Sequence, residues 1–265
     1  MEYKNILIER DGHIATVRFN RPEKLNTLSI EMMHEIDDLA RSFEEDEDTR
    51  VVIFTGNGDN FCAGVDLSDH MQSDKAREAT MLMQLRRVRI GPRMIRSIYE
   101  INQITIAAIN GFALGGGACI AAACDFRIGA HDCRAGFPEV NLAMNLSWIS
   151  LPLVVHLIGP ARAKYMVISA DRIHAEELSK WGFLDKLVPA EDLMKTALEM
   201  ADMVASKPPL AAQMVKRSVN AISSALDQAI MHMDSDQFLY TTSGKDFLEA
   251  VEAFFQKRKG EFKGN

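Results

Sequence analysis

Two short stretches of the sequence carry glycines where the backbone itself could do chemistry. One is FCAGVD at residues 61–66, and the other is GGG at residues 115–117, just before an alanine-rich segment. Glycine inside a helix or strand costs about 0.5–1 kcal/mol relative to alanine, so a triplet needs a reason. N–H groups at a helix start are unpaired and partly positive, and glycine lets a ligand atom approach them closely. Two such donors from different loops predict an oxyanion hole, which stabilises negative charge developing on a carbonyl oxygen.

Two other interpretations of the glycines compete with an oxyanion hole. A phosphate-binding loop would need GxGxxG or GxxxxGK(S/T), and the triplet has neither pattern. The glycines could also serve only to let two elements pack tightly, and this second interpretation stays open.

The cysteines do not form a pattern typical of a metal site or a disulfide framework. They stand at positions 62, 119, 124 and 133. A zinc site made from the last three with His131 would lack a CxxC pair, and the strand-like run at 124–130 would separate its ligands. We therefore expect no metal site, reduced thiols and a cytoplasmic location.

Hydrophobic patterning predicts the elements that position the two glycine loops. In chain order they are a hairpin at 5–20 turning at Asp11-Gly12, a helix from Ser29 to about Glu45, a strand at 51–56, a helix at about 75–100, a strand at 104–110, a buried helix at 117–123 and a strand at 125–130. The strands at 51–56 and 104–110 each run into a glycine-containing loop. Two such strand–loop–helix passages predict an α/β domain with a layered parallel sheet.

From about Asp192 onward the strand signals vanish, and the remaining segments all show helical periodicity. Such a tail is too thin to form a large core of its own. We expect it to pack on the α/β body or on a second subunit.

Composition is that of an ordinary globular protein. The chain has 265 residues, of which 47% are hydrophobic and 25% are charged, enough for one large domain or a domain with an appendage. The N-terminus lacks a signal-peptide layout, and no run of about 18 uninterrupted apolar residues predicts a membrane span.

The net charge of −7 argues against a nucleic-acid partner, so an anionic ligand would need a local basic patch. Two groups of basic residues are candidates for such a patch, or are simply solvated helix faces. They are Arg86, Arg87, Arg89, Arg93 and Arg96, and Lys257, Arg258, Lys259 and Lys263.

Several motifs, in this order and spacing, resemble the enoyl-CoA hydratase/isomerase (crotonase) family. They are FCAGVDL (61–67), INGFALGGG (109–117), CDFRIGA (124–130), FPEVNL (137–142) and the long run at 158–189, and the match extends from residues 20–29 to 253–264. The resemblance implies an α/β, crotonase-like spiral of ββα units at 1–190 that holds the acyl-CoA site. It also implies a helical C-terminal trimerisation region at 191–265, giving a homotrimer or a homohexamer.

The resemblance further implies an acyl-CoA thioester substrate whose oxygen receives the backbone N–H groups of Val65 and Gly116. Because coenzyme A is part of the substrate, no separate cofactor is expected, and neither is a nucleic-acid or membrane partner. The neighbouring residues expected to contact the substrate are Ala63, Gly64, Asp66, Leu67, Gly115, Cys119 and Trp148.

Coenzyme A itself is expected along the loops at 21–26 and 63–68. Its phosphates could be bound by Lys24, or by Lys257 and Lys259 from the tail.

The carboxylates of the expected site depart from the family pattern. Hydratases of the family usually place one glutamate three residues after the middle glycine and another in the PEV motif. Here the second is Glu139, but the first position holds Cys119. Adding water needs activation of that water and delivery of a proton, which two acid/base groups normally share. A thiol with a reference pKa of about 8.5, raised further in apolar surroundings, replaces a carboxylate poorly, so we interpret Cys119 as a small buried hydrophobe.

A double-bond shift needs only one base. Glu139 could remove a proton from C2 of a 3-enoyl-CoA and return it to C4, and burial against Phe137, Pro138 and Leu142 would raise its pKa toward a useful range. The sequence therefore favours a single-glutamate isomerase. A hydratase with a non-standard water-activating group remains an alternative, as does a catalytically weak acyl-CoA-binding or RNA-binding relative.

Other polar residues could rescue hydration or shape the acyl pocket. Asp66 and Asp69 follow the first glycine loop, and Asp66, as part of the family motif, could serve loop structure instead. The segment AMNLSWISLP lacks the glycine-rich stretch that many relatives carry. We expect Asn145, Ser147 and Trp148 to shape the pocket there.

Overall fold

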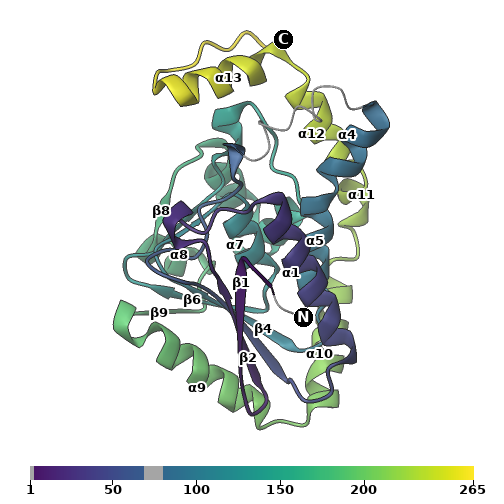
Figure 1. Ribbon diagram of the computed structural model, residues 1–265, viewed down its shortest axis with the longest axis vertical. Coiled ribbons are helices and arrows are strands. Elements are labelled where there is room, and N and C mark those ends of the chain that lie inside the picture. Colours follow the sequence, from purple (N-terminus) through teal and green to yellow (C-terminus); the bar gives the residue numbers. More distant parts are fainter. Residues whose placement is uncertain (1–2, 69–79) are drawn as a thin grey trace.

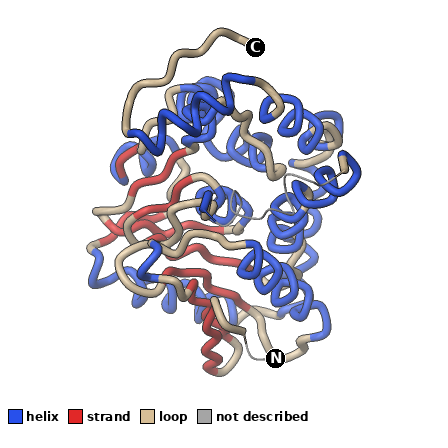
Figure 2. Tube along the Cα trace, turned by 45° about the horizontal axis from the view of Figure 1, so that its top comes forward, coloured by secondary structure: helices blue, strands red, loops and turns tan. Residues whose placement is uncertain are grey.

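A six-stranded sheet forms the centre of the computed structural model, which describes residues 3–68 and 80–265. The strand order is β1-β2-β3-β4-β6-β9, and every neighbouring pair is parallel except β1 with β2. Figure 2 shows these strands as one layer with helices along its sides. The strands are β1 (Ile6–Asp11), β2 (Ile14–Phe19), β3 (Val51–Gly56), β4 (Ile104–Ile109), β6 (Phe126–Ala130) and β9 (Lys186–Val188). The predicted α/β fold with a layered parallel sheet is confirmed.

A second, smaller sheet is formed by β5 (Phe112–Leu114), β7 (Arg134–Gly136) and β8 (Ile173–His174). β5 pairs with β7 in parallel, and β7 pairs with β8 antiparallel. Its first strand, β5, lies between β4 and the glycine triplet in the chain.

The hairpin turn differs by one residue from the prediction. Asp11 pairs with Ile14, so the two loop residues are Gly12 and His13 rather than Asp11 and Gly12. Gly12 takes a positive φ of 53°, a conformation that glycine adopts without a Cβ penalty. Asp11 remains in the β-ladder because its backbone groups still have a partner on the other strand.

The helices largely follow the predicted pattern. They are η1 (Pro22–Lys24), α1 (Ile30–Ser42), η2 (Phe43–Glu45), α4 (Met81–Val88), α5 (Ile90–Tyr99), α6 (Gly116–Ala123), η3 (Pro138–Leu142), α7 (Ser150–Ile168), α8 (Ala175–Trp181), η4 (Ala190–Asp192), α9 (Leu193–Ala205), α10 (Pro209–Ser223), α11 (Gln228–Met231), α12 (Asp234–Thr242) and α13 (Lys245–Gln256). Ser29 caps α1 as predicted, because its Oγ accepts the N–H of Met32 at 3.1 Å. The helical segment expected at 75–100 divides, in its described part, into α4 and α5 at Arg89.

Two hydrophobic clusters pack on the two faces of the six-stranded sheet. The larger one includes buried side chains of α1, α5, α6 and α7. In the smaller one, Leu193, Ala197 and Ala201 of α9 pack on strand residues such as Val51 and Ile106. The first helix of the C-terminal region therefore covers a sheet face of the body (Figure 1).

The last helices reach back over the body. α12 contacts α4, and α13 contacts η3, although these segments lie far apart in sequence. Figure 1 shows α12 and α13 at the end of the molecule where α4 lies. Packing of the tail on the α/β body is confirmed. Many large apolar side chains of this region nevertheless remain exposed, among them Leu210, Val215, Val219, Ile222, Leu226, Tyr240, Leu248, Phe254 and Phe255.

Among the described residues one helix, α7, is long and apolar enough to cross a membrane, with a mean hydropathy of 1.2. Its backbone leaves helical geometry at Gly159 (φ 77°, ψ 161°), directly before Pro160. Its N-terminal half packs in the core, where Leu153 and Val154 are buried. These features are typical of a core helix in two halves.

Candidate functional site

The two glycine loops lie side by side. The first is held to residue 28 by two backbone hydrogen bonds, from Leu28 N to Gly64 O (2.8 Å) and from Asp66 N to Leu28 O (3.0 Å). It is held to β5 by a bond from Leu114 N to Cys62 O (2.9 Å). These bonds fix the backbone of residues 62–66 next to the start of the glycine triplet.

Two backbone donors are available at this junction. α6 begins at Gly116, with Gly115 as its N-cap, so the predicted helix N-terminus is confirmed. The N–H of the first helical residue has no partner within the helix. Within residues 3–68 and 80–265, neither the Gly116 N–H nor the Val65 N–H donates to another group of the chain. Both can therefore bind a ligand oxygen.

Two glycines of the triplet lie close to other groups of the chain. Gly115 has a positive φ of 51°, and a Cβ there would lie 3.0 Å from Oε1 of Glu139. A Cβ on Gly117 would lie 2.2 Å from the backbone oxygen of Cys62. The packing interpretation thus holds for Gly117, whereas Gly115 leaves room for a carboxylate.

Trp148 lies against the middle glycine. A Cβ on Gly116 would lie 2.7 Å from Cζ3 of Trp148 and 2.8 Å from Cδ1 of Leu28. On its other side the indole meets α5, where a Cβ on Gly91 would lie 2.0 Å from Cε2. The ring therefore fills the space between the starts of α5 and α6.

Glu139 stands in η3 with its carboxyl group turned toward the glycine loops. Its Oε1 lies near Gly115, and its Oε2 is buried without a hydrogen-bond partner in the described part of the chain. Burial raises the pKa of this carboxyl from 4.5 to about 7, and a hydrogen bond with its own backbone opposes the rise. Phe137 and Leu142 are buried beside it. The predicted direction of the pKa shift is confirmed.

Cys119 is buried, with 1% of its surface exposed. Burial raises the pKa of its thiol well above the ordinary value, and the negative charge of Glu139 adds to the rise, while a hydrogen bond with Ser150 opposes it. The thiol is therefore neutral near pH 7, as expected for a small buried hydrophobe. All four cysteines are buried and none forms a disulfide.

Asp66 fixes the loop that carries Val65. Its carboxylate is 7% exposed and forms ion pairs with Arg21 (3.0 Å) and Lys24 (3.2 Å). This supports the loop-structural role considered for it. Because Lys24 contacts Asp66 here, its assignment to a phosphate of coenzyme A stays a prediction. Asp69 lies outside the described residues.

A polar hollow of about 630 Å³ borders the loop at 21–26 where coenzyme A is expected. It is lined by Lys4, Asn5, Asn20, Arg21, Glu23, Ser29, Ile30 and Glu31. Ala63 and Leu67 are half-buried on the loop at 63–68, the second loop where coenzyme A is expected.

The basic residues considered as phosphate ligands are placed differently. Lys257 and Lys259 are exposed beyond the end of α13. In the first basic group, Arg93 pairs with Asp37 at 2.8 Å.

The segment carrying Trp148 depends on a carboxylate that sequence reasoning missed. Trp148 (φ 62°) and Ile149 (φ 53°) both take the left-handed conformation. Asp234, the first residue of α12, accepts the Ile149 N–H at 3.2 Å. Burial raises the pKa of Asp234 to about 6. Asn145 also faces α12, where it contacts Gln237.

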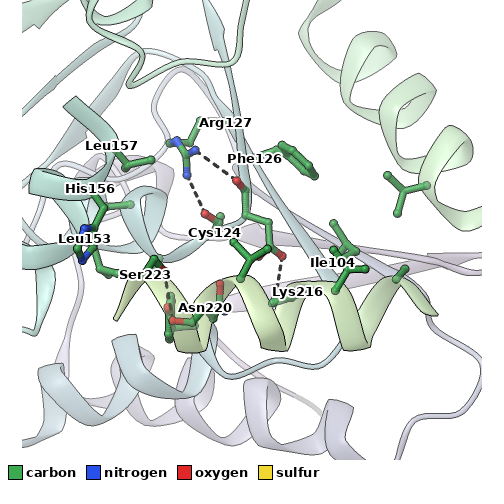
Figure 3. A pocket seen from close by; sticks show the side chains of 18 of the residues that line it. Ile104, Cys124, Phe126, Arg127, Leu153, His156, Leu157, Lys216, Asn220 and Ser223 are labelled. Carbon is green, nitrogen blue, oxygen red and sulfur yellow. Dashed lines mark hydrogen bonds and ion pairs between the residues drawn. The ribbon is translucent and has the colours of Figure 1, made fainter. Parts of the chain in front are cut away.

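A separate cavity of about 590 Å³ lies at the other end of α6, between α10 and α7 (Figure 3). Its buried cations are already paired, since Lys216 contacts Asp125 at 2.7 Å and Arg127 donates to the Cys124 backbone. Glu139 and the two glycine loops are not part of it. In the described ranges, no three His, Cys, Asp or Glu side chains gather in a way that could hold a metal ion.

Comparisons with known proteins agree on one family. The family model described as "Enoyl-CoA hydratase/isomerase" matches residues 9–265. The short-chain-enoyl-CoA hydratase of Clostridium acetobutylicum is 34% identical over 98% of both chains, and the crotonyl-CoA hydratase of Syntrophomonas wolfei is 34% identical over 99% of both. A crystal structure of an enoyl-CoA hydratase/isomerase from Pseudoalteromonas atlantica superimposes with a TM-score of 0.86 at 25% identity, covering 98% of this chain and 100% of that one.

Proposed function

Because the chain belongs to the enoyl-CoA hydratase/isomerase family, we propose that it shifts the double bond of a 3-enoyl-CoA with Glu139 as the only base. Its crotonase-like fold and its place among acyl-CoA enzymes follow from the family. One observation carries the finer proposal. Glu139 presents a buried, unpartnered Oε2 beside the glycine loops, whereas the neutral thiol of Cys119 occupies the position of the usual other glutamate.

In this mechanism the thioester oxygen accepts the N–H groups of Val65 and Gly116. Ionised Glu139 takes a proton from C2, and the electron pair of that C–H bond passes into a dienolate whose negative charge rests on the thioester oxygen. Glu139 then returns the proton to C4, so the product is the 2-enoyl-CoA and no atom is gained or lost. Removing one such donor typically costs about 10²–10³ in rate. A base with a pKa of about 7 can both accept and return a proton near neutral pH.

Hydration of a 2-enoyl-CoA is the second candidate, favoured by the relatives named as hydratases. It would need a water-activating group other than Cys119. A catalytically weak acyl-CoA-binding or RNA-binding protein would instead bind its ligand without turnover.

Chromatography coupled to mass spectrometry, after incubation with crotonyl-CoA and, separately, with a 3-enoyl-CoA, distinguishes these functions, because the two enoyl-CoA isomers elute separately. Isomerisation moves the double bond without changing mass, whereas hydration adds the mass of one water molecule. We expect isomerisation by the wild type and none by Glu139→Gln. Glu191→Gln, at an exposed position in η4, is the matched control. Hydration without isomerisation would overturn the proposal in favour of the second candidate.

We also propose that the protein assembles as a homotrimer or homohexamer in the cytoplasm and needs no cofactor beyond the coenzyme A of its substrate. Exposed apolar side chains such as Ile222, near the end of α10, and Leu226, just after that helix, support assembly. Light scattering coupled to gel filtration tests the assembly, and turnover after exhaustive dialysis against a chelator tests the cofactor statement. A monomer, or loss of activity on dialysis, would contradict the respective part.

A further inference from the structure

We propose that Trp148 is the specificity-determining wall of the acyl site, limiting it to short acyl groups, and that Asp234 is the positioning residue that holds this wall. The inference rests on the proposed acyl-CoA function and deepens it by naming a substrate class. It connects the C-terminal helix α12 with the glycine triplet.

The indole lies against Gly116, the residue whose N–H is proposed to bind the thioester oxygen. Its Cζ3 lies 2.7 Å from the Cβ position of Gly116, and its Cε2 lies 2.0 Å from that of Gly91. With the indole in this place, any side chain at Gly116 or Gly91 would collide with it. A thioester bound to the Gly116 N–H therefore has the indole as its neighbour, and a long chain running between α5 and α6 would have to displace it.

The backbone that presents the ring is strained and needs an external support. Trp148 and Ile149 are consecutive left-handed residues, a conformation that bulky side chains disfavour. Neither is a glycine, so the strain must be offset by contacts elsewhere.

Asp234 supplies that support from α12. Its carboxylate accepts the N–H of Ile149, the residue next to Trp148, at 3.2 Å. Successive N–H groups in such a turn converge on one side and form a small anion-binding hollow. Ile149 is also the N-cap of α7, so the partial positive charge of the helix start acts on the same carboxylate. The negative charge of Asp234 thus stabilises the turn at Trp148 and Ile149, and this turn sets the orientation of the indole.

Acyl chain-length preference tests both roles without depending on turnover. Titration calorimetry compares the affinities for butyryl-CoA and decanoyl-CoA, two saturated ligands that cannot react. We expect the wild type to bind butyryl-CoA more tightly. Trp148→Ala should shift the ratio of affinities by about tenfold or more toward decanoyl-CoA, since each methylene in an apolar pocket counts for about tenfold or more. Asp234→Asn should shift it in the same direction by less.

Fluorescence reports on the ring itself. The chain has two tryptophans, and Trp181→Phe leaves Trp148 as the only one. In that background, Asp234→Asn should move the emission to longer wavelength as the indole gains access to water. Asp236→Asn, an exposed neighbour on α12, is the matched control and should change neither emission nor chain-length preference.

An unchanged affinity ratio in Trp148→Ala would overturn the role of Trp148 as a wall. If the alanine variant does not fold, the same ratio is measured in Trp148→Phe, which keeps a smaller ring. An unchanged ratio and emission in Asp234→Asn would overturn the positioning role. If no enoyl-CoA is turned over but the affinity ratio still shifts, the proposed reaction fails while the wall stands.

Discussion

Replacing Glu139 by glutamine should make the protein more stable at alkaline pH while abolishing its activity. The folded state keeps this carboxyl protonated up to about pH 7, compared with its ordinary value of 4.5. Below about pH 4.5 both the folded and the unfolded chains hold the proton, so the group does not affect stability there. Between about pH 4.5 and about pH 7 the unfolded chain releases the proton first, so the wild type loses stability as the pH rises.

The full cost of ionising the buried carboxyl is about 3 kcal/mol, at about 1.4 kcal/mol per pH unit of difference between the two states. Glutamine does not ionise and escapes this cost. Between about pH 5 and pH 8, the stability of Glu139→Gln relative to wild type should therefore increase by roughly 2–3 kcal/mol. Other groups titrate equally in both proteins and cancel from the comparison.

Urea unfolding followed by circular dichroism at these two pH values measures the difference. Glu191→Gln serves as the control for replacing an exposed glutamate, and its stability relative to wild type should hardly depend on pH. The reasoning is refuted if the relative stability of Glu139→Gln does not change with pH. A decrease with rising pH would mean that a partner of the ionised carboxylate, missing from the structure, stabilises its charge.

Four further outcomes test the site. The kcat/KM of the wild type should rise with pH and level off above about pH 7, because the base acts when ionised, and a flat profile would contradict that role. Gly116→Val should lower kcat by about 10²–10³ because the side chain blocks a donor and meets Trp148, and kinetics near wild type would exclude the donor. Cys119→Ala should keep isomerase activity nearly intact, whereas a large loss would show that the thiol takes part. Gly117→Ala should destabilise the fold by about 1–3 kcal/mol in urea unfolding, since its Cβ meets the Cys62 carbonyl, and unchanged stability would argue against that contact.

Features set by local chemistry could be predicted from the sequence. Ser29 before an amphipathic run indicated the start of α1, and a glycine triplet after a buried strand indicated the start of α6. Apolar neighbours of Glu139 were enough to predict the direction of its pKa shift. In each case the determining residues lie within a few positions of one another.

Features set by distant partners could not be predicted. Trp148 and Ile149 take left-handed conformations that neither residue type suggests, because Asp234, far along the chain, holds them. The hairpin turn was placed one residue early because pairing across the strands, rather than the Asp-Gly dipeptide, sets the register. Gly91 also gave no signal, since its neighbour Trp148 comes from another element.

The return of α12 and α13 over the body has a consequence for synthesis on the ribosome. The sheet strands and both glycine loops are complete once β9 ends at Val188. The carboxylate that supports Trp148 and the helix that packs on η3 belong to α12 and α13, which are made later. Contacts between such distant parts of the chain form late because a long loop must close first. A nascent chain can thus form the six-stranded sheet and both glycine loops before Asp234 is available to hold the backbone of Trp148 and Ile149.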